Sequence, residues 1–231
     1  MGGQACVFYG AAQVSKDIDI LILSEPDNLV RLEAAIQQLQ GRRIAVPPFS
    51  AAVLDRGHAV HFRCDASGVQ GLRVDVMSRL RASPDFAAMW ERRTTFVDET
   101  DLEYHLLCVP DLVHAKKTQR SKDWPVIELL VTIHYRENMS DPSQRHIDFW
   151  FREARSAELL VELCRRFPEQ MKKQSQARPL ISLAAEGVND ELRAALDAEV
   201  RAEQAKDRAY WEPLRRELEQ FRRDHRDGGA R

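Results

Sequence analysis

The chain has few cysteines, no long apolar run and almost no net charge, and each of these features argues against a class of protein. Its four cysteines are scattered without close pairs, which argues against zinc and disulfide frameworks and favours reduced thiols. No apolar run approaches the ~20 residues that a membrane span needs, and no signal segment opens the chain. We therefore expect a cytoplasmic protein with no membrane partner.

A formal charge of -2 gives no general signal for binding polyanions, so a nucleic-acid partner has to be argued from local patches. With 231 residues the chain is long enough to bury a sizeable core, as one large domain or two smaller ones. The composition is that of an intracellular enzyme.

The most informative feature is a group of aspartates in runs that are typical of strands. Asp17 and Asp19 flank one isoleucine, and alternation along a strand points both side chains to the same face. Asp75 lies in a second apolar, β-branched run. Three carboxylates on adjoining strands suit a divalent cation such as Mg²⁺, which prefers oxygen ligands and leaves positions for substrate phosphates. Taken alone, the two-aspartate pattern is more often an exposed strand face.

Together with the glycine pair Gly2-Gly3, these aspartates make the chain resemble the polymerase-β-type nucleotidyltransferase superfamily. The resemblance implies that Gly2 and Gly3 let the backbone approach a triphosphate. It also implies that Asp17 and Asp19 hold Mg²⁺ or Mn²⁺, and that Asp75 helps to hold the metal or activate the incoming hydroxyl.

The chain departs from this family at its start. The glycine pair normally follows a strand and a helix that brace it, whereas only Met1 precedes Gly2 here. A glycine turn at a free terminus is poorly held. We expect that the leading elements are truncated.

The segment 111–124 resembles a motif that follows the catalytic core in bacterial abortive-infection and toxin-type nucleotidyltransferases. The resemblance implies phosphate contact from Lys116 or Lys117, with support from Arg120 and Lys122. A solvated basic helix face explains the same residues equally well.

The patterns predict an α/β (α+β) fold, with a nucleotidyltransferase-like mixed sheet, packed helices and a helical C-terminal region. We expect a catalytic core over 1–110, including two further sheet strands over 94–97 and 103–109, and a helical region over 111–231. The last helical segment, 189–226, is expected to be interrupted at Pro213.

Some polar and aromatic residues are predicted to be structural. His58 and His61 are three residues apart in a strand-like run, so they lie on opposite faces, and we interpret both as structural or surface residues. The side formed by Phe86, Met89 and Trp90 is more typical of a core than of a platform for stacking bases.

The hypothesis for function is transfer of a nucleoside monophosphate from an NTP to a hydroxyl acceptor, either RNA (tRNA included) or protein, in a toxin-antitoxin setting. A basic cluster offers either an RNA contact or a hydrated surface; it comprises Arg165, Arg166, Lys172, Lys173 and Arg178. The alternative is an inactive module of the same fold that binds a partner, with an antitoxin or a second copy of the chain as that partner.

Overall fold

The computed structural model describes residues 1–44 and 46–228. The chain forms two compact units, which are described separately below. The first comprises Met1–Phe8, Ala12–Ala115 and the chain from Arg208 onward, and the second comprises Tyr9–Ala11 and Lys116–Asp207. In this division the long last helix contributes residues to both units, and the expected boundary at 110/111 stays a prediction.

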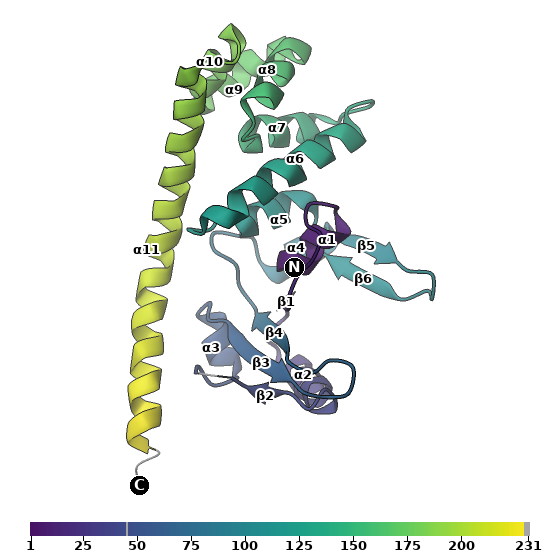
Figure 1. The fold of residues 1–231 in the computed structure, drawn as a ribbon, viewed down its shortest axis with the longest axis vertical. Coiled ribbons are helices and arrows are strands. Elements are labelled where there is room, and N and C mark those ends of the chain that lie inside the picture. Colours follow the sequence, from purple (N-terminus) through teal and green to yellow (C-terminus); the bar gives the residue numbers. More distant parts are fainter. Residues whose placement is uncertain (45, 229–231) are drawn as a thin grey trace. The chain divides into compact units, whose positions relative to one another are not determined.

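The first unit contains a mixed sheet, a hairpin and several helices (Figure 1). Its elements are α1 (Gly2–Phe8), β1 (Asp17–Leu21), α2 (Pro26–Gln38), β2 (Arg42–Arg43), α3 (Ala51–Asp55), β3 (Val60–Cys64), β4 (Leu72–Met77), α4 (Phe86–Glu91), β5 (Thr94–Val97), β6 (Glu103–Leu106), α5 (Val109–Lys116) and the second part of α11 (Asp190–Gly228). The expected α/β fold class, with a mixed sheet and packed helices, is confirmed.

The sheet has four strands in the order β1-β4-β3-β2. Strand β1 runs parallel to β4, with Asp19 beside Asp75, while β3 is antiparallel to both β4 and β2. The two predicted aspartate strands are therefore neighbours in register. Strand β2 was not anticipated from the sequence, because two arginines do not form an apolar pattern.

One face of the sheet is apolar and packs against helices α2 and α3. Helix α2 begins with Pro26 at its first turn, where the missing N–H costs nothing, and its buried stripe includes Ile36. The buried core of this face consists of Ile36, Val53, Leu54, Val60, Phe62, Cys64, Val74 and Val76. Because side chains alternate along each strand, the opposite face carries the polar residues of the same strands.

The prediction that residues 94–97 and 103–109 extend the main sheet is wrong. Strands β5 and β6 form a separate two-stranded antiparallel hairpin. Its register places Phe96 opposite Tyr104, and both rings contact Phe8 of helix α1. The second run also ends early, since α5 starts at Val109.

The predicted interruption at Pro213 is also wrong, because α11 runs continuously from Asp190 to Gly228 with Pro213 inside it. Proline removes one backbone hydrogen bond and crowds the preceding turn. Contacts of the helix with its own unit offset this cost: Leu214 is buried, and Glu217 accepts a hydrogen bond from the buried His58 at 2.8 Å.

The second unit is helical. It contains the 3₁₀ turn η1 (Ser121–Asp123), helices α6 (Trp124–Asn138), α7 (Gln144–Glu153), α8 (Ala157–Arg166), α9 (Pro168–Ala177) and α10 (Leu180–Glu186), and the first part of α11. Trp150 of α7 is fully buried in this unit and donates its ring N–H to His134 of α6 at 2.9 Å. Within residues 1–44 and 46–228, every helix is too short or too polar to cross a membrane.

Candidate functional site

The three predicted aspartates lie together on the polar face of the sheet. Asp17 is paired in register with Arg73, and Asp19 with Asp75, across the parallel strands β1 and β4. His61 of β3 lies opposite Asp75 on its other side. Since paired residues of neighbouring strands share a face, all five side chains project from one side of the sheet.

Asp75 is held by two basic side chains. Arg73 donates to both carboxylate oxygens, from Nε to Oδ1 at 2.7 Å and from Nη2 to Oδ2 at 2.9 Å. The His61 Nδ1 lies 2.8 Å from Oδ1. Burial raises the pKa of Asp75, but the hydrogen bonds from His61 and Arg73 outweigh it and lower the pKa below its ordinary value. Asp75 is therefore a stable anion with both oxygens engaged.

Asp19 has the opposite electrostatic character. Burial raises its pKa, and the negative charges of Asp17 and Asp75 raise it further. The weak hydrogen bond from the backbone N–H of Gly3, at 3.4 Å, offsets only part of this. Burial and the two neighbouring carboxylates thus disfavour the charged form of Asp19 more than the Gly3 N–H and the amino terminus favour it.

The glycine pair packs directly on this acidic group. Gly2 has φ of +66°, and a Cβ placed on it would lie 1.8 Å from Oδ2 of Asp19. A Cβ on Gly3 would lie 2.3 Å from Oγ of Ser15, which itself donates to Asp17 Oδ1 at 3.1 Å. Gly2 requires glycine because the backbone lies so close to Asp19, and Gly3 because it lies so close to Ser15. They begin α1 and do not form an open turn.

The donor set of Asp17 and Asp19 fits a hard divalent cation, because both side chains are carboxylates. The pKa of Asp19 is raised first by burial and then by the negative charges of Asp17 and Asp75, which a cation would offset. Asp75 contributes differently, since its oxygens are bound to Arg73 and His61. In the part of the chain that the structure describes, no group of three or more His, Cys, Asp or Glu is arranged to hold a metal ion. Of the three expected carboxylates, Asp17 and Asp19 therefore remain as candidate metal ligands. The third, Asp75, lies beside them and is hydrogen-bonded to Arg73 and His61.

A small aromatic hollow adjoins Leu21, the residue that follows Asp17 and Asp19 on the same face of β1. Its volume is about 100 Å³, and its wall includes Leu21, Trp90, Arg93 and His105. Trp90 is 40% exposed and carries the Arg93 guanidinium 4.0 Å above its ring. The prediction that the Trp90 side of this helix belongs to the core holds for Met89 and is wrong for Trp90.

The basic residues expected to contact phosphate are paired within the second unit. Lys116 lies 3.4 Å from Asp123, and the Nε of Arg120 donates to the same carboxylate at 2.8 Å. Burial raises the pKa of Asp123, but Thr118 and these two cations outweigh it and lower the pKa. Lys122 is exposed.

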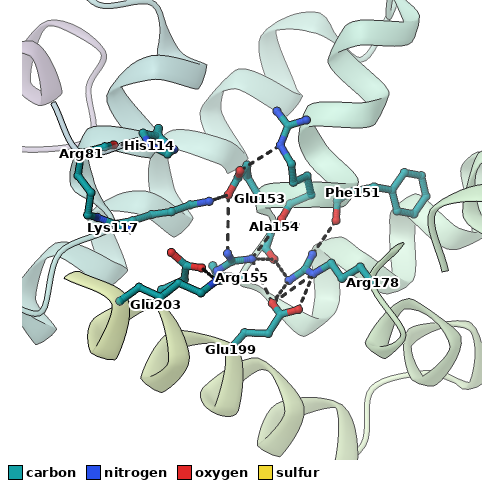
Figure 2. Close-up of polar contacts among 12 residues, drawn as sticks. Arg81, His114, Lys117, Phe151, Glu153, Ala154, Arg155, Arg178, Glu199 and Glu203 are labelled. Atoms are coloured by element: carbon teal, nitrogen blue, oxygen red, sulfur yellow. Dashed lines mark hydrogen bonds and ion pairs between the residues drawn. The ribbon is translucent and has the colours of Figure 1, made fainter. Parts of the chain in front are cut away.

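Lys117 belongs to a buried ion-pair network (Figure 2). Its Nζ lies 2.6 Å from Glu153, which is 5% exposed and whose other neighbours include Arg155. Arg155 in turn lies 3.4 Å from Glu199 of α11. Desolvation and the charge of Arg178 lower the pKa of Arg155. These pairings favour a structural role for Lys117.

Arg178, the last member of the predicted basic cluster, is also structural. It is 9% exposed, and its guanidinium donates to the carbonyls of Phe151 and Ala154 and to Glu199 at 2.6, 2.9 and 2.6 Å. Lys172 pairs with Glu169 on the surface. The cluster is thus not one continuous basic surface.

Sequence reasoning missed two members of the site, Arg73 and His61. Arg73 precedes Asp75 by two residues, and this spacing places both on one strand face, so the strand period already contained the signal. His61 was interpreted as structural or surface because it was compared only with His58, whereas its partner lies on the neighbouring strand. Only the pairing of β3 with β4 reveals it.

Comparisons of the chain with protein-family models, with curated proteins and with solved structures found no match. The resemblance to nucleotidyltransferases therefore rests on the residues themselves.

Proposed function

We propose that the chain is a metal-dependent nucleotidyltransferase that transfers a nucleoside monophosphate from an NTP to a hydroxyl acceptor and releases pyrophosphate. The observation that carries the proposal is the convergence of Asp17, Asp19 and Asp75 on one polar sheet face, beside a glycine pair that packs against them. The pKa of Asp19 is raised by burial and further by the charges of Asp17 and Asp75, and this repulsion between carboxylates supports a site that a cation completes.

Each residue has a distinct proposed role. Asp17 and Asp19 would hold Mg²⁺ or Mn²⁺, which supplies neutralisation of phosphate charge for in-line displacement. Asp75 would orient the acceptor hydroxyl or take its proton, with Arg73 and His61 fixing its carboxylate. By resemblance alone, Gly2 and Gly3 would approach the triphosphate. The phosphate contacts that the resemblance implies for Lys116 or Lys117, with Arg120 and Lys122, are not part of the proposal, because Lys116, Lys117 and Arg120 are paired with carboxylates of the second unit. In the cytoplasm the acceptor would be RNA, tRNA included, or protein.

The test is transfer of label from each α-labelled NTP to total RNA, protein or metabolites, with Mg²⁺ or Mn²⁺ and with EDTA as the metal-free control. Asp17→Asn, Asp19→Asn and Asp75→Asn should each abolish transfer, since each keeps its volume and loses its charge. The matched control is Asp27→Asn, an exposed acid on α2 outside the site. Transfer that survives all three site substitutions, or that needs no metal, would refute the proposal.

The second candidate is an inactive module of the same fold that binds a partner such as an antitoxin or a second copy of the chain. It is favoured by the engagement of Asp75 with Arg73 and His61, whose hydrogen bonds reach both of its carboxylate oxygens and leave an acceptor position on Oδ2 alone. Calorimetry separates the two candidates. Metal-dependent NTP binding that Asp19→Asn removes supports the enzyme, and its absence from the unmodified chain supports the module.

A further inference from the structure

Three arginines lie side by side across the polar face of the sheet. Arg42 of β2 pairs in register with Arg63 of β3, and Arg63 pairs with Arg73 of β4. Arg73 in turn pairs with Asp17 of β1. Neighbouring strands are about 4.8 Å apart, so this arginine row (Arg42, Arg63 and Arg73) spans roughly 10 Å and ends at the aspartates.

Such a row is costly for folding unless an anion compensates it, because like charges directly opposite each other on neighbouring strands destabilise a sheet. Only Arg73 has a strong partner, Asp75. Arg42 lies 3.5 Å from Asp65, and the two side chains are 74% and 46% exposed. Such an exposed ion pair contributes little to stability. Arg63 is exposed, and it has no ion-pair partner within residues 1–44 and 46–228.

Protection of the sheet edge does not explain the row. Charged side chains on an edge strand prevent unwanted pairing with other strands, which accounts for Arg42 and Arg43 on β2. Arg63 lies on β3, an interior strand, where no such protection is needed. A hollow of about 260 Å³ is lined by Arg42, Arg43, Ile44 and Arg63, so two of the three arginines of the row border a space that a ligand can enter.

We propose that the arginine row binds the phosphodiester backbone of single-stranded RNA and directs its end toward Asp75. Guanidinium groups engage phosphate oxygens in a forked geometry, and a strand laid from β2 toward β1 reaches the acidic side of the face after crossing Arg63 and Arg73. This inference rests on the proposed function for the role of the RNA as acceptor, and binding itself requires no turnover.

The experiment measures binding of a fluorescent single-stranded RNA of mixed sequence to the full chain by anisotropy, in EDTA without NTP, at salt concentrations from about 50 to 200 mM. Arg63→Gln should weaken binding several-fold at low salt and reduce the magnitude of the salt slope by about 0.7, the value for one phosphate contact on a single strand. Arg63→Lys keeps the charge and should keep most of the slope. Arg31→Gln, which removes an exposed arginine from α2, is the matched control and should change neither quantity.

The proposal is overturned if the unmodified chain binds no RNA, or if Arg63→Gln binds RNA with the same affinity and slope as Arg31→Gln. It is also overturned if Arg63→Gln weakens ATP binding and leaves RNA binding unchanged, since the row would then serve a nucleoside triphosphate. Circular dichroism checks that each variant is folded. Failure of label transfer with intact RNA binding counts against the proposed function alone, so the two failures are distinguishable.

Discussion

Removal of the Arg178 guanidinium tests how the second unit is held together. In Arg178→Met, an apolar chain of similar length replaces the side chain, so the packing of its stem is largely preserved. The hydrogen bonds to the carbonyls of Phe151 and Ala154, at the end of α7, are lost together with the ion pair to Glu199.

The magnitude follows from which groups lose their partner. Both carbonyls are buried, and a buried acceptor left without a donor costs about 1–3 kcal/mol. This cost applies to the carbonyl of Phe151, because the carbonyl of Ala154 keeps a hydrogen bond from the Arg155 guanidinium at 3.2 Å. Glu199 is less affected, because it is partly exposed and keeps Arg155 at 3.4 Å. We expect a loss of about 2–4 kcal/mol in the free energy of unfolding, from one acceptor left without a donor and one lost, partly exposed ion pair. This is a large part of the stability of an ordinary domain, which is about 5–15 kcal/mol.

The assay is urea unfolding followed by tryptophan fluorescence and far-ultraviolet circular dichroism. Trp150 is fully buried in the same unit, so its emission reports this unit. Lys172→Met is the control, because the Lys172–Glu169 pair is exposed and should contribute less than about 1 kcal/mol. The loss in Arg178→Lys should lie between those of the two methionine variants, because an ammonium keeps the positive charge but lacks the several fixed N–H donors of the guanidinium. Equal losses in Arg178→Met and Lys172→Met would refute the reasoning.

Three further predictions concern single groups. Burial, and to a lesser extent the charge of His146, lowers the pKa of His134 to about 4. Its Nδ1 accepts the Trp150 N–H, so between about pH 4 and pH 6.5 the unfolded chain binds a proton that the folded chain does not. The free energy of unfolding should therefore fall as the pH drops from about 6.5 toward 4. The pH dependence of the urea midpoint should be flatter in His134→Gln, and an unchanged profile would contradict this. Burial raises the pKa of Cys108 to about 11, so this thiol should react with a disulfide reagent at pH 8 far more slowly than a free cysteine, as mass spectrometry of the native chain would show. Pro213→Ala restores one backbone donor in α11 and should raise the thermal midpoint, with a gain of up to about 3 kcal/mol; a lower midpoint would mean that the proline serves packing.

The sequence alone predicted the local features of the site. The strand period places Asp17 and Asp19 on one face whatever their surroundings, and the apolar runs around them and around Asp75 identified both strands. Helix α2 was equally predictable, because its proline start and apolar stripe are local signals. These features depend on residues only a few positions apart.

Tertiary structure decided what the aspartates contact. Asp19 and Asp75 are 56 positions apart in the chain, and only the pairing of β1 with β4 places them side by side. The same pairing, with β3 and β2, brings His61 to Asp75 and aligns Arg63 with Arg73. The hairpin of β5 and β6, whose strand pattern was recognised, forms a sheet of its own. Strand patterns specify which residues are extended, whereas the choice of neighbour depends on long-range packing, which no local pattern encodes.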